Sequence, residues 1–251
     1  MSLFDFANIL FAGPCNRACS WCIGKRLPPE VNRSNLDLWP LRNLDGFVEK
    51  VNEARVPEIV FTGTVTDPHL YRFEAKLIQE LRRRLHPGAR ISIHTNGVLS
   101  LKKLPVFNLY DRAAISFPSF EPEVYGKLMG SRRVPDLARI VERAAIPVKV
   151  SAVVNEHNEA GVEDFLDRCR GIGVRRLVLR RLFSDSRPWP SFAGLRPAGE
   201  YRGNPVMDFS GMEVTLWNFE ASTCRSLNLF ADGTLGTSYL LTETEQLRRT
   251  A

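Results

Sequence analysis

Short apolar runs alternate with amphipathic helical patterns along the first 182 residues of the chain. Apolar and β-branched residues in runs of five to seven predict strands, and apolar residues three and four positions apart predict helices. The predicted strands cover 8–12, 58–62, 91–95, 113–117, 148–154 and 176–182. The predicted helices include 41–51, 73–85, 134–144, with Pro135 tolerated in its first turn, and 162–169. Strand and helix units that follow one another in this way predict parallel strands joined by right-handed crossovers.

The pattern changes after residue 182. Residues 183–211 are rich in Pro, Gly, Ser and aromatic residues and show no clear period, which is typical of a lid or binding segment, with a disordered segment as the alternative. Residues 213–218 and 226–241 have an extended pattern, and Asp232 and Gly233 predict a hairpin turn within the second stretch. We therefore expect two parts, a strand-and-helix domain over 1–182 and a C-terminal lid segment with a β-hairpin extension over 183–251. Residues 243–251 are expected to form a frayed tail.

Composition places the chain among ordinary globular proteins. It has 251 residues, of which 44% are hydrophobic and 25% charged, enough for one substantial core. No apolar run approaches the roughly 18 residues of a membrane span, and the N-terminus does not have the pattern of a signal peptide. The net charge of +6 permits a nucleic-acid partner, but no recognised binding motif supports one. Five cysteines, an odd number, argue against a disulfide framework, so we expect a cytoplasmic protein.

Three cysteines stand close together after the first predicted strand. Cys15, Cys19 and Cys22 have the spacing Cys-x3-Cys-x2-Cys, with Trp21 directly before the last. Three thiolates cannot complete a four-ligand zinc or structural iron–sulfur site, but they can hold three irons of a [4Fe–4S] cluster and leave the fourth open. A half-built zinc site is the alternative, although no further ligands stand nearby. A chance group of core cysteines is a second alternative, although this loop is polar.

This loop resembles that of the radical S-adenosylmethionine (SAM) family. The resemblance implies a [4Fe–4S] cluster on Cys15, Cys19 and Cys22, SAM bound to the open iron, and an external electron donor of the flavodoxin or ferredoxin type. It also implies an α/β fold with a partial (β/α)6 barrel of the TIM type, followed by a small C-terminal extended or hairpin region. The hydrophobic pattern alone leaves an open doubly wound sheet equally acceptable.

The resemblance further implies which residues bind SAM, because ligands of such barrels lie at the carboxyl ends of the strands. Gly63 and Thr64 follow the second strand, where the family often has Gly-Gly-Glu-Pro and receives the methionine ammonium group. Arg180 and Arg181 alternate in direction on the sixth strand, and the sequence leaves open which one faces the interior. Each position also has a purely structural interpretation. The full set expected to bind SAM is Trp21, Gly63, Thr64, Thr66, Ser116, Ser151, Asn155 and Arg180.

Two further residues are candidates for catalysis. His94, at the end of the third strand, could donate a proton, although a structural role is the favoured interpretation. Cys224 begins a stretch similar to the tail of the GTP cyclase of molybdenum-cofactor synthesis, in which the equivalent cysteine holds a second cluster. Companion cysteines are missing here, since only Cys169 remains and its helical pattern places it in the core. We expect no second cluster, and Cys224 to be structural or to face the substrate.

The sequence thus predicts an enzyme that cleaves SAM reductively and uses the 5′-deoxyadenosyl radical to abstract hydrogen from a small-molecule or nucleotide-like substrate. A maturase that modifies a peptide or protein side chain is the alternative. A non-catalytic iron–sulfur or zinc-binding protein is a third possibility of another class. Fourteen residues precede Cys15, so we expect no leader-peptide domain before it, and we expect no cobalamin-binding domain.

Overall fold

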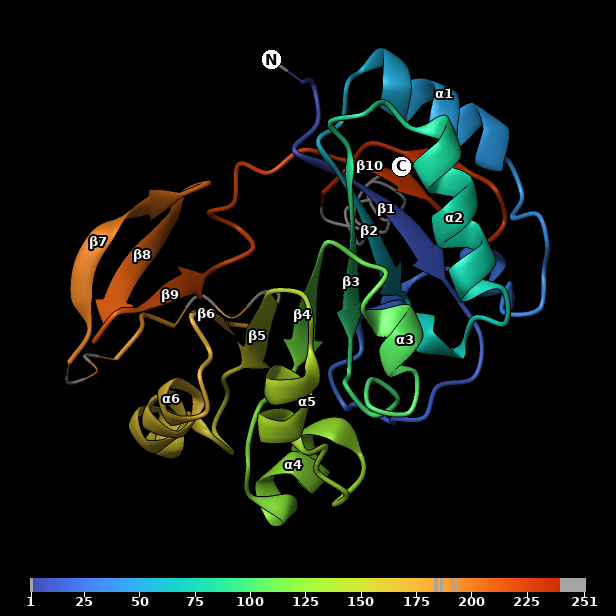
Figure 1. Cartoon of the computed structure of the whole chain (residues 1–251). Helices are drawn as coiled ribbons and strands as arrows, with labels where there is room; N and C mark the ends of the chain where they lie inside the picture. The colour runs from blue at the N-terminus through green and yellow to red at the C-terminus, as the bar shows by residue number, and fades with distance from the viewer. Residues whose placement is uncertain (1, 183–184, 186, 191, 193, 240–251) are drawn as a thin grey trace.

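The structure is a computed structural model that describes residues 2–182, 185, 187–190, 192 and 194–239. The predicted tail at 243–251 lies outside these residues. One sheet organises the described chain, in the strand order β11-β10-β1-β2-β3-β4-β5-β6-β9-β8-β7 (Figure 1). Its first six strands are β1 (Phe6–Phe11), β2 (Glu58–Gly63), β3 (Arg90–Thr95), β4 (Arg112–Ser116), β5 (Val148–Val153) and β6 (Arg176–Arg180). The others are β7 (Arg196–Tyr201), β8 (Asn204–Phe209), β9 (Met212–Trp217), β10 (Ser226–Leu229) and β11 (Leu235–Gly236).

Strands β1 to β6 pair in parallel and in sequence order, so the predicted partial barrel is confirmed. Two strands from the C-terminal region extend it. β9 joins β6 and β10 joins β1, both in parallel. β10 and β11 form an antiparallel hairpin across Asp232 and Gly233, as predicted. β9 and β10 are not neighbours in the sheet, so the barrel is open between them.

The helices lie on the outer face of the sheet, with α1 and α2 beside the β1–β3 half and α4, α5 and α6 beside the β4–β6 half (Figure 1). Each has an apolar stripe that it buries against the strands. Their bounds are α1 (Leu44–Glu53), α2 (Glu74–Arg84), α3 (Leu104–Phe107), α4 (Pro122–Met129), α5 (Leu137–Arg143) and α6 (Val162–Gly171). Short 3-10 helices are η1 (Ile23–Arg26), η2 (Pro29–Asn32), η3 (Pro68–Leu70) and η4 (Glu159–Gly161).

Two helices were not predicted, and α1 and α5 each begin three residues later than predicted. α3 and α4 are too short to show a clear period, and both have proline in their first turn. The helix expected from residue 134 begins at Leu137, because the carboxylate of Asp136 accepts a hydrogen bond from the Arg139 amide and caps it. Pro135 therefore precedes the helix.

Strand β5 separates an apolar outer face from a polar inner face, as its alternation predicted. Val150 and Ala152 are fully buried in the core between sheet and helices. Lys149 and Ser151 point the other way, into the barrel. This alternation determines which side chains can reach a ligand in the interior.

The segment expected to be irregular contains an antiparallel hairpin. β7 and β8 pair with each other, and β8 pairs with β9. Every residue of β7 is exposed, and the pairing has a bulge between Pro197 and Gly199, so the segment has no apolar alternation to detect. Phe192 and Phe209 are buried in the main core.

A small apolar cluster connects the two ends of the parallel sheet. Val178 of β6, Trp217 of β9 and Cys224 are buried together, with Phe6 of β1 and Tyr239 packed against them. Nearby, an ion pair joins Arg202 in the β7–β8 turn to Asp5, directly before β1. These contacts bring the C-terminal region across the open side of the barrel.

Candidate functional site

The cysteine loop lies at the carboxyl end of β1, against the loop that follows β2. Cys15 is exposed, whereas Cys19 and Cys22 are half-buried. The Cys22 thiol donates to the Thr64 carbonyl oxygen at 3.3 Å. The two loops approach so closely that a Cβ atom on Gly24 would lie 2.2 Å from that same oxygen. A Cβ on Gly63 would lie 1.8 Å from the Thr66 carbonyl oxygen, which explains glycine at both positions.

The thiols of this loop need a positive partner to become ligands. Burial, followed by the charges of Cys22 and Cys15, raises the pKa of the Cys19 thiol to about 11. Burial is also the main reason that the pKa of Cys15 is raised. Thiolates bind metals, so a bound metal would have to supply the compensating charge.

The loop also carries hydrogen-bond donors that lack acceptors. Asn16 Nδ2, Arg17 Nε and Trp21 Nε1 are buried and have no partner among the described residues. Within the described part of the chain, no group of metal-binding side chains is arranged to hold a single ion. A four-iron cluster, in contrast, takes each thiolate at a separate iron and presents several sulfur acceptors. The loop therefore fits such a cluster.

The threonines expected to bind SAM fasten the loops to one another. The Thr64 hydroxyl donates to Asn32 Oδ1 at 2.6 Å, and the Thr66 hydroxyl donates to the Pro14 carbonyl oxygen at 2.6 Å. The backbone of both residues remains beside the cysteine loop. Their role toward SAM stays a prediction.

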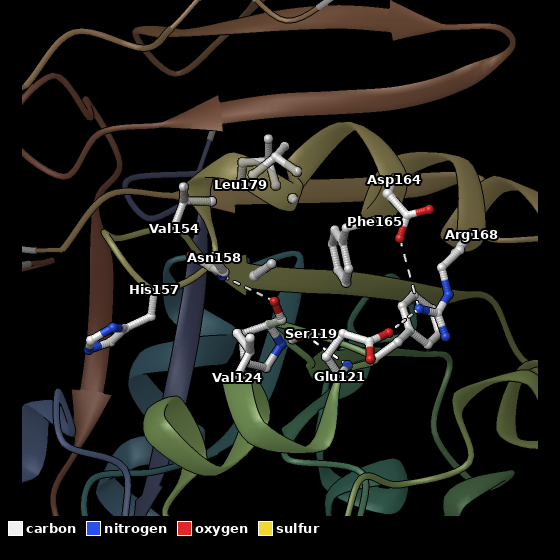
Figure 2. Close-up of a pocket in the computed structure, with 15 residues that line it drawn as sticks. Ser119, Glu121, Val124, Val154, His157, Asn158, Asp164, Phe165, Arg168 and Leu179 are labelled. Atoms are coloured by element: carbon white, nitrogen blue, oxygen red, sulfur yellow. Dashed lines mark hydrogen bonds and ion pairs between the residues drawn. The ribbon is translucent and has the colours of Figure 1, made fainter.

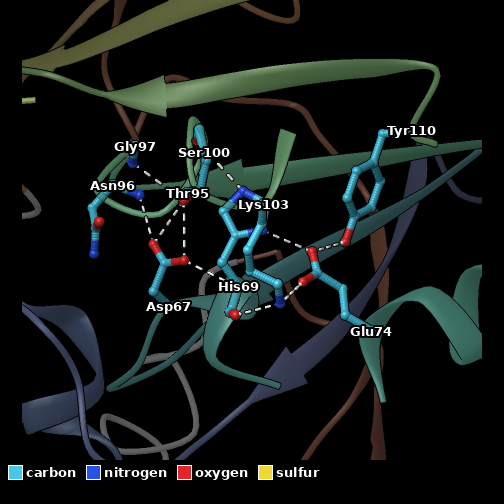
Figure 3. A network of polar contacts seen from close by, with 9 residues as sticks. All are labelled: Asp67, His69, Glu74, Thr95, Asn96, Gly97, Ser100, Lys103 and Tyr110. Atoms are coloured by element: carbon cyan, nitrogen blue, oxygen red, sulfur yellow. Dashed lines mark hydrogen bonds and ion pairs between the residues drawn. The ribbon is translucent and has the colours of Figure 1, made fainter. Parts of the chain in front are cut away.

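Asp67 connects the exits of β2 and β3 (Figure 3). Its carboxylate is 2% exposed and accepts hydrogen bonds from the His69 amide, the Thr95 hydroxyl and the Asn96 amide. Asn96 in turn donates through Nδ2 to Asn16 Oδ1 at 2.7 Å, inside the cysteine loop. Neither Asp67 nor Asn16 stands out as a site residue in the sequence, because the contacts through which they brace the loops join residues far apart in the chain.

A second buried carboxylate continues this network. Glu74 of α2 accepts from His69 Nδ1 and from the Tyr110 hydroxyl, both at 2.8 Å, and pairs with Lys103 (Figure 3). Burial opposes its charge, but the hydrogen bonds and charges of His69 and Lys103 prevail and lower the pKa of Glu74. This network stabilises the loops that follow β2 and β3, and its side chains do not face the barrel interior.

Arg180 is the arginine of β6 that faces the interior. Its Nε donates to Ser151 Oγ at 2.8 Å, and its guanidinium lies 5.5 Å from the centre of the Trp217 ring. Arg181 points to the outer side, where it is 2% exposed and pairs with Glu159.

Two further residues expected to bind SAM lie at these strand ends. Ser116 is the register partner of Ser151 and is half-buried beside it. The Asn155 side chain shapes its own loop, because its Oδ1 accepts from the His157 amide.

The barrel interior is positively charged. Burial, and then the charges of Lys149, Arg180 and Arg112, lowers the pKa of His94 well below its usual range. Burial, and then Arg180, lowers the pKa of Lys149 to about 8. Glu58 is the one carboxylate that counteracts this effect on Lys149. His94 is therefore neutral at neutral pH, in a space that favours anions.

The two remaining cysteines occupy apolar surroundings. Cys169 of α6 is fully buried in the core, as predicted, and burial raises the pKa of its thiol to about 12. Cys224 is 9% exposed in the cluster with Trp217, and burial raises the pKa of its thiol. The cysteine loop and Cys224 thus lie in different environments.

A separate cavity of about 150 Å³ lies between α4 and α6 (Figure 2). Val124, Phe165 and Leu179 line its apolar part, and Arg168, paired with Glu121, lies at its rim. Leu179 and Arg180 are adjacent on β6 and face opposite sides of the sheet. The cavity is therefore outside the barrel and separate from the cysteine loop.

Comparison with known proteins gives a family and a fold. The sequence profile described as the radical SAM superfamily matches residues 9–169. A probable GTP 3′,8-cyclase of Methanococcus aeolicus is 36% identical over 91 residues, which cover 34% of this chain and 30% of that protein. A probable GTP 3′,8-cyclase of Methanosarcina acetivorans is 24% identical over 188 residues, covering 65% and 51%. The chain thus spans about half or less of the curated relatives it matches.

A similar solved structure is that of Streptococcus suis SuiB bound to its precursor peptide SuiA. It superposes with a TM-score of 0.56 at 15% identity, covering 72% of this chain and 40% of SuiB. SuiB bound to S-adenosylmethionine gives a TM-score of 0.55. At this identity the likeness concerns the fold. None of the helices in the described residues is long and apolar enough to span a bilayer.

Proposed function

Because the chain belongs to the radical SAM superfamily, whose enzymes use a [4Fe–4S] cluster and SAM, we propose that it abstracts hydrogen from a small anionic substrate held inside the barrel. A nucleotide, another phosphate ester or a carboxylate fits this description. The observation that carries the proposal is the interior charge. Burial, and then the charges of Lys149, Arg180 and Arg112 from three adjacent strands, depress the pKa of His94. Glu58 is the carboxylate that opposes these cations, and it pairs with Arg112.

The proposed roles of the residues follow from their positions along the barrel interior. Cys15, Cys19 and Cys22 would hold the cluster, which when bound supplies the electron that cleaves SAM. Lys149 is the second residue of β5 and lies deeper than Ser151, so its ammonium group is placed to bind an anionic group of the substrate. Arg180, between Ser151 and the aromatic cluster, would orient either the SAM carboxylate or the substrate.

Two other features bear on how the substrate is held. The neutral imidazole of His94 can accept a proton or a hydrogen bond without adding to the positive charge. Residues 183–211 are proposed to cover the open side when substrate binds, because a carbon radical open to solvent would react with solutes such as thiols or the reductant.

Anaerobic reconstitution tests the proposal in two stages. The protein should bind about four irons per chain and cleave SAM when reduced, and Cys19→Ala should lose both. The matched control is Cys169→Ala, whose buried thiol belongs to the core. Candidate substrates deuterated at single carbons should then transfer deuterium into 5′-deoxyadenosine. Full cluster content and cleavage in Cys19→Ala would refute the assignment.

One observation favours a second candidate, a maturase that modifies a peptide. β7 is an edge strand with all its residues exposed, and an extended peptide can pair with such an edge. Pro197 and the bulge before Gly199 limit that pairing, which is why the anionic small molecule is preferred. If deuterium is transferred from a peptide but from no phosphorylated or carboxylated small molecule, the maturase becomes the preferred function.

An external electron donor is also part of the proposal. The segments 15–33 and 127–133 contain seven cations and one carboxylate, Glu30. They adjoin, because Arg17 donates to the Arg133 carbonyl oxygen at 2.7 Å. A basic surface beside the cluster loop suits an acidic protein of the flavodoxin or ferredoxin type. Its exposed cations are Lys25, Arg26, Arg33, Lys127, Arg132 and Arg133.

A further inference from the structure

The side-chain amide of Asn16 has a buried hydrogen-bond donor for which the described residues provide no acceptor. It stands between Cys15 and Cys19, and its Nδ2 is fully enclosed and without a hydrogen-bond partner. An unsatisfied buried donor costs about 1–3 kcal/mol. Buried polar groups are almost always paired in folded proteins, so this one requires an explanation.

A chain of hydrogen bonds fixes the direction of this donor. The Val98 amide donates to Asn96 Oδ1 at 3.1 Å, so the Asn96 side chain must present its Nδ2 on the other side. That Nδ2 donates to Asn16 Oδ1 at 2.7 Å. Since the Asn16 oxygen is occupied, its nitrogen points away from Asn96, and rotating the amide by half a turn would break the contact.

The Asn96 anchor is itself rigid. Its backbone amide donates to the buried carboxylate of Asp67 at 2.7 Å, which also accepts from Thr95. The Asn16 amide is thus held by the same brace that joins the exits of β2 and β3. A side chain fixed in this way has lost its rotational freedom before any ligand arrives.

The Asn16 amide occupies the immediate surroundings of a cluster ligand. The Cys15 thiol lies 3.8 Å from Asn16 Oδ1, to which it donates. A thiolate bound to iron has no proton, so that contact is lost on loading. What the amide can then offer is its free N–H, and sulfur atoms of a cluster accept such hydrogen bonds.

We propose that Asn16 tunes the reduction potential of the cluster by donating its Nδ2–H to the Cys15 thiolate or to a sulfide beside it, and that Asn96 is the positioning residue that holds it there. This inference rests on the proposed function, in that it requires the cluster. Reduction adds negative charge to the cluster, so the hydrogen bond is stronger in the reduced state and raises the potential. The cluster would be easier to reduce than without Asn16.

The test is the midpoint potential of the reconstituted cluster, titrated without SAM and followed by electron paramagnetic resonance. Asn16→Leu keeps the branched shape and the number of heavy atoms but has no donor, and we expect it to lower the reduction equilibrium constant about tenfold. For a one-electron couple this is a shift of about 59 mV to more negative potential. Asn96→Ala keeps the Asn16 amide but frees it, so a smaller shift in the same direction is expected. The control is Ser20→Ala, an exposed residue of the same loop that should leave the potential unchanged.

The outcomes separate this inference from the proposed function. A wild-type protein that binds no cluster contradicts the proposed function. Full iron content with an unchanged potential in Asn16→Leu overturns the inference alone. Weaker SAM binding with an unchanged potential also overturns it, because the donor would then serve SAM. If Asn16→Leu fails to load, Asn96→Ala decides, and an unchanged potential in that variant overturns the inference.

Discussion

Two polar clusters at the carboxyl ends of the strands differ in how completely they are paired. In the network around Glu74, each carboxylate oxygen has a donor from His69, Lys103 or Tyr110 (Figure 3). In the cysteine loop, donors such as Asn16 Nδ2 have none among the described residues. Complete pairing fits a group that supports the fold, whereas three donors that are unpaired in the described structure and gather beside the three cysteines fit a ligand bound there.

The charges make the same distinction. Cations beside Glu74 overcome the effect of its burial and lower its pKa, so this pair is balanced within the protein. Inside the barrel, burial and then the neighbouring cations lower the pKa of Lys149 instead. The first arrangement stabilises the folded chain, whereas the second opposes folding and favours binding of an anion.

The largest effect on stability is expected from the balanced network. Glu74→Gln removes the buried charge and leaves Lys103 without its partner, so we expect a loss of about 3 kcal/mol or more in the free energy of unfolding, measured by urea denaturation. Since the pKa of Glu74 is lowered, its contribution is present at neutral pH and is lost as pH falls through that pKa. Glu80→Gln on the same helix, whose partner Arg83 is exposed, should cost at most about 1 kcal/mol. Equal losses in the free energy of unfolding in Glu74→Gln and Glu80→Gln would contradict the stabilising role of the Glu74 network.

The unbalanced interior should respond in the opposite direction. Lys149→Met removes a cation whose pKa is lowered to about 8, so at pH 7 the substrate-free protein should become more stable, by about 3 kcal/mol. In the wild type both states are protonated below pH 8, and stability rises between pH 8 and the ordinary lysine value because the unfolded chain still binds the proton. The variant should lack this rise, and exposed Lys102→Met should keep it. A destabilised Lys149→Met variant would mean that Lys149 is paired inside the barrel.

The same contrast explains how far the sequence could predict the molecule. The six strands of the barrel were found within a few residues, because buried parallel strands are continuous apolar runs. The β7–β8 hairpin was missed, because Pro197 and Gly199 interrupt a strand that buries no face. Local composition therefore predicts buried parallel strands but not an exposed hairpin strand.

Within the site, spacing identified the cysteines but not their surroundings. The contact between Asn96 and Asn16 joins positions 80 residues apart, and that between Asp67 and Asn96 joins positions 29 apart. Such pairs depend on the register of neighbouring strands, which a single sequence does not contain. The inward direction of Arg180 likewise follows from its pairing with Val153.

A smaller effect is expected from His94. Its pKa is lowered by burial and then by Lys149, Arg180 and Arg112, so the folded protein resists a proton that the unfolded chain accepts near pH 6.5. Stability should therefore fall as pH decreases below about 6.5, with a slope approaching about 1.4 kcal/mol per pH unit. His94→Asn should flatten this slope when unfolding is measured between pH 5 and 7. The exposed control variant His157→Asn should leave the slope unchanged. An unchanged slope in His94→Asn would mean that the interior charges lie farther from His94.

The smallest effect is expected at the basic surface beside the cysteine loop, since exposed charges act mainly on association rates. Arg26→Glu combined with Arg33→Glu should slow reduction of the cluster by an acidic electron-transfer protein about tenfold at low salt, and less as salt increases. Reduction by dithionite, a small molecule that needs no docking surface, should stay within about twofold. Arg90→Glu, at the opposite end of the strands, provides the matched control. If the wild type, the double variant and Arg90→Glu are all reduced at the same rate by the acidic donor, the donor docks elsewhere, and the cations of this surface have no part in electron delivery.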